Sequence, residues 1–96
     1  MKQHRYRVTV EHLADQHGAP MQRDPLQFEV GNHDDIFSIV ERMQQRAEFD
    51  PQTMTAFAVG LKLLSEVMLE HRGNPLFEEL APHFTQFMKE LKKGGR

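Results

Sequence analysis

The residues of this chain best suited to chemistry are its six histidines, because neutral imidazole is the commonest metal ligand and titrates near neutral pH. His4 and His12 share one face of an alternating segment, but they lie about 26 Å apart along an extended chain. No His-x-x-x-His or His-Glu-x-x-His pattern occurs in the sequence. We therefore predict no metal site, and scattered surface or core-edge histidines are the simpler interpretation.

An alternative hypothesis gathers some of these side chains at one end of a small sheet. His4, Tyr6, His12 and His33 could there bind a small ligand or a metal, in a binding protein or an enzyme. His33-Asp34-Asp35 resembles an acid–base cluster, but consecutive helical residues point about 100° apart and cannot converge alone. Capping of the following helix explains both aspartates more simply.

Other catalytic chemistries find no support in the sequence. Cysteine is absent, which excludes thiolate catalysis, disulfides and cysteine-based zinc sites. The nucleophile elbow and the glycine patterns of phosphate and dinucleotide sites are missing as well. We therefore predict no catalytic residue and no cofactor, and the balance is against an enzyme.

Charge and hydropathy limit the partners of the chain. A formal net charge of −2 offers no general attraction for nucleic acid. Lys2, Arg5 and Arg7 could contact phosphate, but solvated charges that protect an edge strand explain them equally well, with Glu29 as a partner for Arg7. Nucleic-acid binding is therefore not expected. Without a signal-peptide core or an apolar run near 18–20 residues, a cytoplasmic protein with no membrane segment is expected.

The length and the apolar pattern predict a single α+β domain over residues 1–96. A chain of this size can build one core but not two. Alternation of apolar and polar residues predicts a strand over residues 4–13 and a second over 26–30. The segment 14–25 between them is rich in glycine, proline and aspartate and is predicted to be a loop.

The two strands are expected to pair antiparallel. Pairing of Val8 near Val30 and of Val10 near Phe28 would place both apolar sets on one face. A two-stranded sheet is marginal alone, so it needs helices against it or more strands from a second copy.

A first helix is expected to begin between Asn32 and Asp35, where Asn32 can act as the cap. Its apolar face is predicted to run from Ile36 through Met43 to Ala47. Phe49-Asp50-Pro51 then stops this helix and starts the next one.

A long helix is predicted from Asp50-Pro51 to about Arg72, with Gly73 as a left-handed cap. Asn74-Pro75 repeats the pairing of a capping residue with proline. The apolar spacing of the last segment continues across Pro82, which interrupts helical hydrogen bonding. We therefore expect a last helix that is kinked or split near Pro82, in the order ββααα.

The long helix has two apolar stripes, although a surface helix needs only one. The stripe through Phe57, Leu61, Leu64 and Met68 is assigned to the core. A second stripe on the far side consists of Ala56, Val59, Gly60, Leu63 and Val67.

Two explanations of the second stripe remain open. Other elements of the same chain could sandwich the helix, or the stripe could form a homodimer interface in which Ala56 and Gly60 allow close helix approach. In the second case Lys62 and Glu66 are expected to form a polar rim. A non-catalytic interaction or homodimerisation module, with an unknown protein partner as a further option, is the first functional hypothesis.

Two segments resemble a short bacterial family known only as a domain of unknown function. They run from Leu26 to Phe37, with the turn Asn32-His33-Asp34-Asp35, and from Gly60 to Leu69, which begins Gly-Leu-Lys-Leu. The resemblance spans nearly the whole chain. It implies a small cytosolic α+β domain in bacteria, with no established activity and no catalytic residues to transfer.

Overall fold

The computed structural model describes residues 2–94. The element order confirms the predicted α+β arrangement ββααα, with the last helical region divided in two. The elements are β1 (His4–Val10), β2 (Leu26–Asn32), α1 (Ile36–Gln44), α2 (Pro51–Glu70), the short 3-10 helix η1 (Pro75–Phe77) and α3 (Leu80–Gly94).

The strands β1 and β2 pair antiparallel, but the predicted register was wrong by two residues. Val8 lies opposite Phe28 and Val10 opposite Leu26. The side chain of Asp15 accepts hydrogen bonds from two backbone amides of its own turn, and this turn brings the chain back sooner than a simple loop would. A shift of two residues preserves the face of every side chain, so the apolar residues still share one face.

The outer face of the sheet carries the predicted ion pair. Arg7 donates to Glu29 at 2.8 Å, and Arg5 lies 3.5 Å from the same carboxylate. All three side chains are more than half exposed, so these pairs contribute little stability and mainly keep the edge charged.

The start and end of α1 differ from the prediction. Asp35, and not Asn32, is the N-cap, since its side chain accepts from the backbone amides of Phe37 and Ser38. Asn32 ends β2 as a fully buried residue. Helix α1 stops at Gln44, and Ala47 adopts a φ of 59°, so Ala47 does not extend the apolar face of the helix.

The starts of α2 and η1 were predicted correctly. Asp50 caps α2 with Pro51 in its first turn, and Asn74 caps η1. Helix α2 ends at Glu70, slightly before the expected residue, and Gly73 has the expected positive φ of 84°. Pro82 lies in the first turn of α3, where a missing amide donor costs no helical hydrogen bond. The break therefore precedes the proline.

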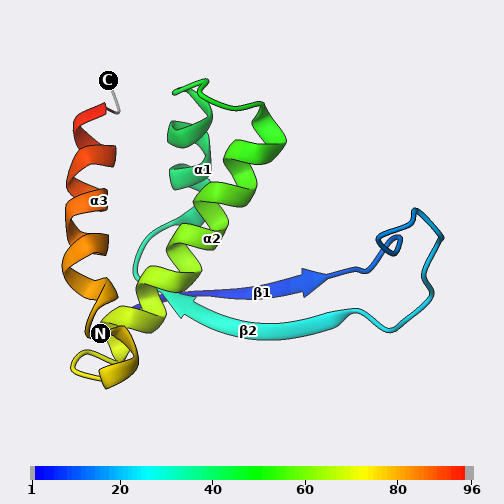
Figure 1. Ribbon diagram of the computed structural model, residues 1–96, viewed down its shortest axis with the longest axis horizontal. Coiled ribbons are helices and arrows are strands. Elements are labelled where there is room, and N and C mark those ends of the chain that lie inside the picture. The colour runs from blue at the N-terminus through cyan, green and yellow to red at the C-terminus, as the bar shows by residue number, and fades with distance from the viewer. Residues whose placement is uncertain (1, 95–96) are drawn as a thin grey trace.

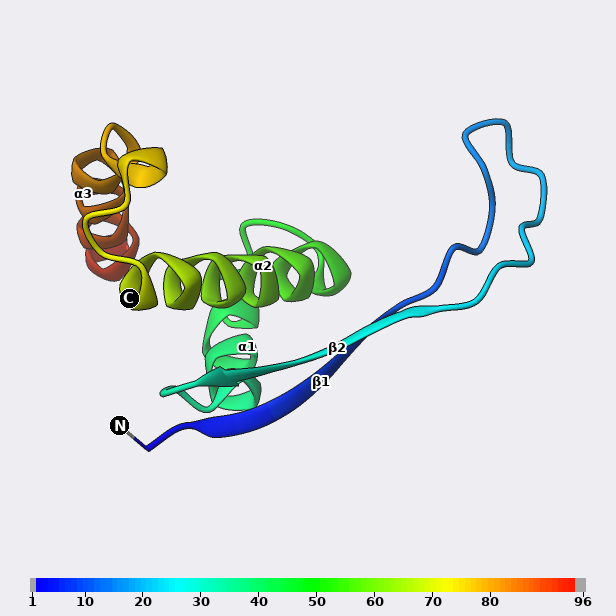
Figure 2. The ribbon, with the colours of Figure 1, turned by 90° about the horizontal axis from the view of Figure 1, so that it is seen from below.

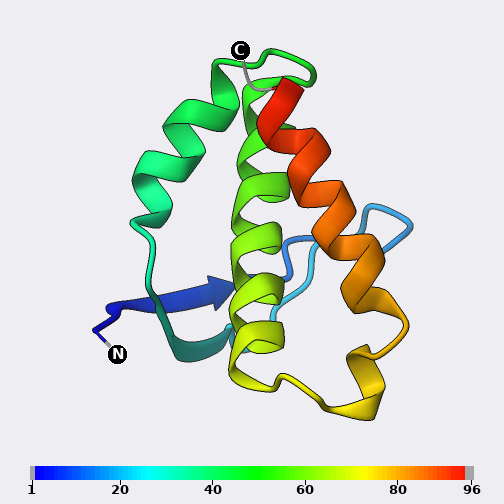
Figure 3. The ribbon, with the colours of Figure 1, turned by 90° about the vertical axis from the view of Figure 1, so that its left-hand side faces the viewer.

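Helix α2 is the centre of the fold, with α1 on one side and α3 on the other (Figure 3). In the part of the chain that the structure describes, four apolar residues are buried, namely Ile36, Met43, Met54 and Ala58. Partly buried side chains from α1, α2 and α3 surround this core, among them Phe57, whose ring meets Phe87 edge-on with centroids 6.2 Å apart.

The hairpin runs past the base of α2 and then leaves the helices (Figure 1). Figure 2 shows the outer part of the hairpin projecting as an extended arm with the loop at its far end. We use the name arm for residues 8–28. Only the inner part of the sheet therefore packs on the body of the molecule.

Candidate functional site

The buried side of α2 changes from apolar to charged along its length. Met54 and Ala58 are fully buried, and the next two positions at the same spacing are Lys62, 8% exposed, and Glu66, 4% exposed. The prediction that Lys62 and Glu66 form an exposed polar rim is therefore wrong. These two residues continue the stripe that faces α1 and the sheet.

Both buried charges are fully partnered. Lys62 Nζ lies 2.6 Å from Asp34 Oδ2. His33 Nδ1 lies 2.8 Å from Glu66 Oε1, and Gln3 donates to the other oxygen of Glu66 at 2.7 Å. Among the described residues, no buried side-chain nitrogen or oxygen lacks a hydrogen bond, so the cost of burying the charges is offset.

The positive surroundings of Asp34 keep it ionised. The hydrogen bond from Lys62 holds the pKa of the Asp34 carboxyl below its ordinary value, against the opposing effect of partial burial, and the charge of Arg42 acts in the same direction. The junction between β2 and α1 is therefore tied to α2 by a charged hydrogen bond.

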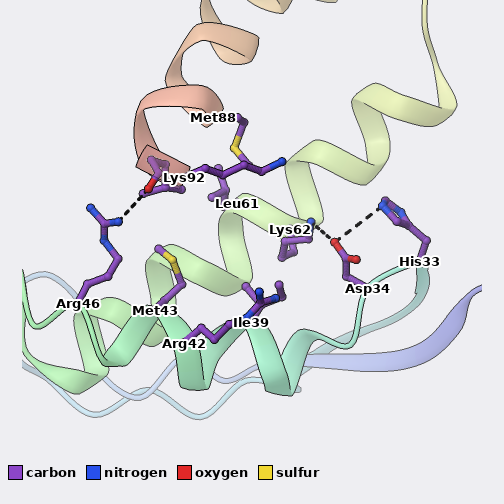
Figure 4. Close-up of a pocket in the computed structure, with 11 residues that line it drawn as sticks. His33, Asp34, Ile39, Arg42, Met43, Arg46, Leu61, Lys62, Met88 and Lys92 are labelled. Carbon is purple, nitrogen blue, oxygen red and sulfur yellow. Dashed lines mark hydrogen bonds and ion pairs between the residues drawn. The ribbon is translucent and has the colours of Figure 1, made fainter. Parts of the chain in front are cut away.

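A cavity of about 540 Å³ lies beside this network, between α1, α2 and α3. Figure 4 shows its lining side chains between α3 and α1, with Asp34 joining Lys62 and His33 at one end. Its charged lining residues are Arg42, Arg46, Lys62 and Lys92 against one carboxylate, Asp34. Sequence reasoning missed this group because its members come from three helices and from the turns on either side of α1, which are far apart in the chain. The spacing of Lys62 and Glu66 on the stripe of Met54 and Ala58 was the one available signal.

Three residues of the predicted ligand cluster, His4, Tyr6 and His33, contact other parts of the protein. Tyr6 donates to the carbonyl of Asp34 and accepts from the amide of Ile36, so its hydroxyl fastens the sheet to the start of α1. The ring of His4 stacks near Tyr6 at 6.2 Å. His33 forms a hydrogen bond with Glu66 of α2.

His12 is not part of that group. It follows the far end of β1 on the arm, whereas His4 begins the strand. Within residues 2–94, no group of three or more histidine or acidic side chains could hold a metal ion.

The candidate interface on α2 is largely uncovered. Ala56 and Gly60 are exposed, Val67 is 44% exposed, and Val59 and Leu63 are partly buried. Leu64, which was assigned to the core, is 40% exposed. We call the surface formed by Ala56, Gly60, Leu63, Leu64 and Val67 the free face of α2.

The C-terminal half of the free face of α2 borders the sheet. A groove of about 530 Å³ lies between α2 and β2, and its apolar lining residues are Phe28, Val30, Leu63, Leu64 and Val67. The free face and the inner end of the arm therefore form one continuous surface.

Comparisons with known proteins match this fold to proteins without an assigned activity. Residues 4–93 match a family described as a domain of unknown function with a solved structure. The crystal structure of a protein of unknown function from Pectobacterium atrosepticum is 38% identical, with a TM-score of 0.83 over 96% of this chain and 99% of that one. No curated protein matches the chain. None of the described helices is both long and apolar enough to cross a membrane.

Proposed function

The chain belongs to this family, DUF3861, and we propose that it acts as a non-catalytic homodimerisation module in the bacterial cytoplasm. The second copy covers the free face of α2 together with the apolar face of the arm. The observation that carries the proposal is the amount of surface that a single copy leaves in water.

One copy exposes 7764 Å² of surface. A compact monomer of its mass, 11.2 kDa, exposes about 5,700 Å². The excess of about 2,000 Å² exceeds the roughly 800 Å² that each partner contributes to a standard protein interface. The radius of gyration of 15.6 Å, against about 12.5 Å for a compact chain of this length, reflects the same extended shape. The surplus is therefore large enough to contain a dimer interface of ordinary size, which would cover somewhat less than half of it.

The exposed surface of the arm is apolar on one face. On the arm, Val10 is 51%, Leu26 63% and Phe28 39% exposed, and the register places all three on one face. Exposed apolar patches of this kind mark protein interfaces. A hairpin with one unpartnered apolar face also gains stability from a second copy.

The centre of the free face suits contact between two helices. Gly60 lies midway along α2, and a Cβ atom there would meet none of the described residues within 4 Å apart from the neighbouring backbone of α2 itself. Ala56, one turn earlier, is equally small, so a second helix can approach the backbone closely. The fold of a single copy therefore does not require a small residue at position 60. Close packing of two α2 helices in a dimer does.

Substitution of Gly60 separates these two requirements. Gly60→Glu should dissociate the dimer, because its charged side chain occupies the contact, whereas Gly60→Ala should keep it. Both replace glycine within a helix, which by propensity alone stabilises a monomer by about 0.5–1 kcal/mol. Sedimentation velocity from 1 to 100 µM measures the association, and circular dichroism confirms that both variants are folded.

A second pair of variants tests the apolar part of the face. Leu63→Glu should weaken dimerisation at least a hundredfold, while the same change at Leu76, which is 78% exposed outside the face, should leave it unaltered. A wild-type protein that stays monomeric at 100 µM, or a dimer that tolerates Gly60→Glu and Leu63→Glu, would refute the proposal. Cell fractionation tests the cytoplasmic location.

A further inference from the structure

We propose that the cavity between α1, α2 and α3 is a binding site for a small organic anion, with a carboxylate or phosphate head and an apolar body. This site lies on a different part of the molecule from the free face of α2.

The cavity concentrates positive charge in a chain that is negative overall. Four of its lining residues are cationic and one is acidic, whereas the whole chain has a formal charge of −2. Such a local excess creates a positive potential that attracts anions.

Two of the four cations are already held by protein groups. Lys62 binds Asp34. Arg46 binds Glu48 through Nε and donates to the carbonyl of Leu91 at 2.9 Å, as the dashed line in Figure 4 shows. These contacts fix the walls of the cavity and leave only part of its charge compensated.

The other two cations remain available to a ligand. Arg42 on α1 and Lys92 on α3 form no ion pair with any residue from 2 to 94. They approach the cavity from opposite helices (Figure 4). An oxyanion that enters the cavity would be attracted by the planar guanidinium of one wall and by the point charge of the lysine on the other. Asp34 also attracts Arg42, but its charge is largely neutralised by the pair with Lys62.

The rest of the lining defines the body of the ligand. The apolar lining side chains are Ile39, Met43, Leu61, Met88 and Leu91. Methionine side chains adapt their shape to a bound group. A volume of about 540 Å³ lies within the range of small-molecule sites. A fully hydrated inorganic ion would leave this apolar surface unused, and a neutral apolar molecule would leave the cations unused.

Methionine methyl NMR reports on the cavity directly. We expect sodium hexanoate, used as the probe, to shift the methyl signals of Met43 and Met88, while Met21 on the arm stays unchanged. 1-Hexanol, which has the same chain without the charge, should bind at least tenfold more weakly. The titration is performed on the wild-type protein and repeated on Gly60→Glu, so that binding at the cavity and association through α2 are read separately.

Charge-removing variants decide whether the cations hold the anion. Arg42→Gln and Lys92→Gln should each raise the dissociation constant for hexanoate about fivefold to tenfold. Lys89→Gln, on α3 but outside the cavity, is the matched control and should leave it unchanged. The proposal is overturned if hexanoate leaves Met43 and Met88 unshifted, if hexanol binds equally well, or if the two cavity variants behave like Lys89→Gln.

Discussion

Lys62 and Glu66 bear opposite charges one turn apart, yet each finds its main partner outside α2. Lys62 binds Asp34, and Glu66 binds His33 and Gln3. Removing one partner of a buried ion pair is strongly destabilising, because the other charge stays buried without compensation. These residues therefore fix the positions of the β2–α1 junction and of the N-terminal segment against the central helix.

The pair between Asp34 and Lys62 predicts a specific sensitivity to acid. The folded-state pKa of Asp34 lies below its ordinary value of 3.8, so its contribution to stability is fully present above about pH 4 to 5 and is lost as the pH falls through the folded-state pKa. Asp34→Asn should lower the free energy of unfolding by about 1–2 kcal/mol at pH 7. This is less than the cost of breaking a fully buried pair, because Asp34 is partly exposed to solvent.

Urea denaturation between pH 2 and pH 7 measures both effects. The difference between wild type and Asp34→Asn should shrink as the pH falls below about 4. Asp24→Asn, at an exposed position on the arm, serves as the control and should change little. A difference that stays constant down to pH 2 would show that the carboxylate charge is not the stabilising feature.

Elements whose signals are local were predictable from the sequence. Asp50-Pro51 and Asn74-Pro75 place the starts of α2 and η1 because a cap acts on amides two or three residues away. Asn32 has the same capping chemistry, and its Oδ1 accepts locally from the amide of Asp34, but its Nδ2 donates to the carbonyl of Lys62, 30 residues later. Its role, like the register of the hairpin and the lining of the cavity, depends on contacts between distant segments that periodicity does not encode.

The attachment of the sheet to α2 depends on a glycine. A Cβ atom at Gly31 would collide with the side chain of Gln3, which donates to Glu66 at 2.7 Å and to Glu70 at 2.9 Å. Gly31→Ala therefore displaces the end of the flexible Gln3 side chain and weakens these hydrogen bonds. We expect a loss of about 1–2 kcal/mol in the free energy of unfolding.

A double-mutant cycle isolates this cause. Once Gln3→Ala has removed the obstructing side chain, Gly31→Ala should cost about 1 kcal/mol less than in the wild type. Chemical denaturation of the four proteins provides the measurement. Strictly additive losses would mean that the backbone of β2, and not contact with Gln3, requires glycine.

In the whole molecule, the second apolar stripe of α2 is only partly covered by the other helices. Helices α1 and α3 flank α2, as an internal sandwich requires (Figure 3), but they leave Ala56, Gly60 and Val67 exposed. The apolar pattern predicted a surplus correctly, while the assignment of Leu64 to the core was wrong. Periodicity identifies which residues share a face, but the crossing of three helices determines which face remains uncovered.

A molecule with this little core should depend on its partner for stability. If unfolding proceeds from a folded dimer to two unfolded chains, mass action raises the melting temperature with protein concentration. For a dimer of this total size, we expect about 2–4 °C for each tenfold increase in concentration. Calorimetry from 5 to 500 µM measures the shift. The Gly60→Ala variant should keep this dependence, and Gly60→Glu should lose it and melt at one temperature throughout. A wild-type melting temperature independent of concentration would show that the four buried apolar residues and the charged network around Lys62 stabilise the single chain alone.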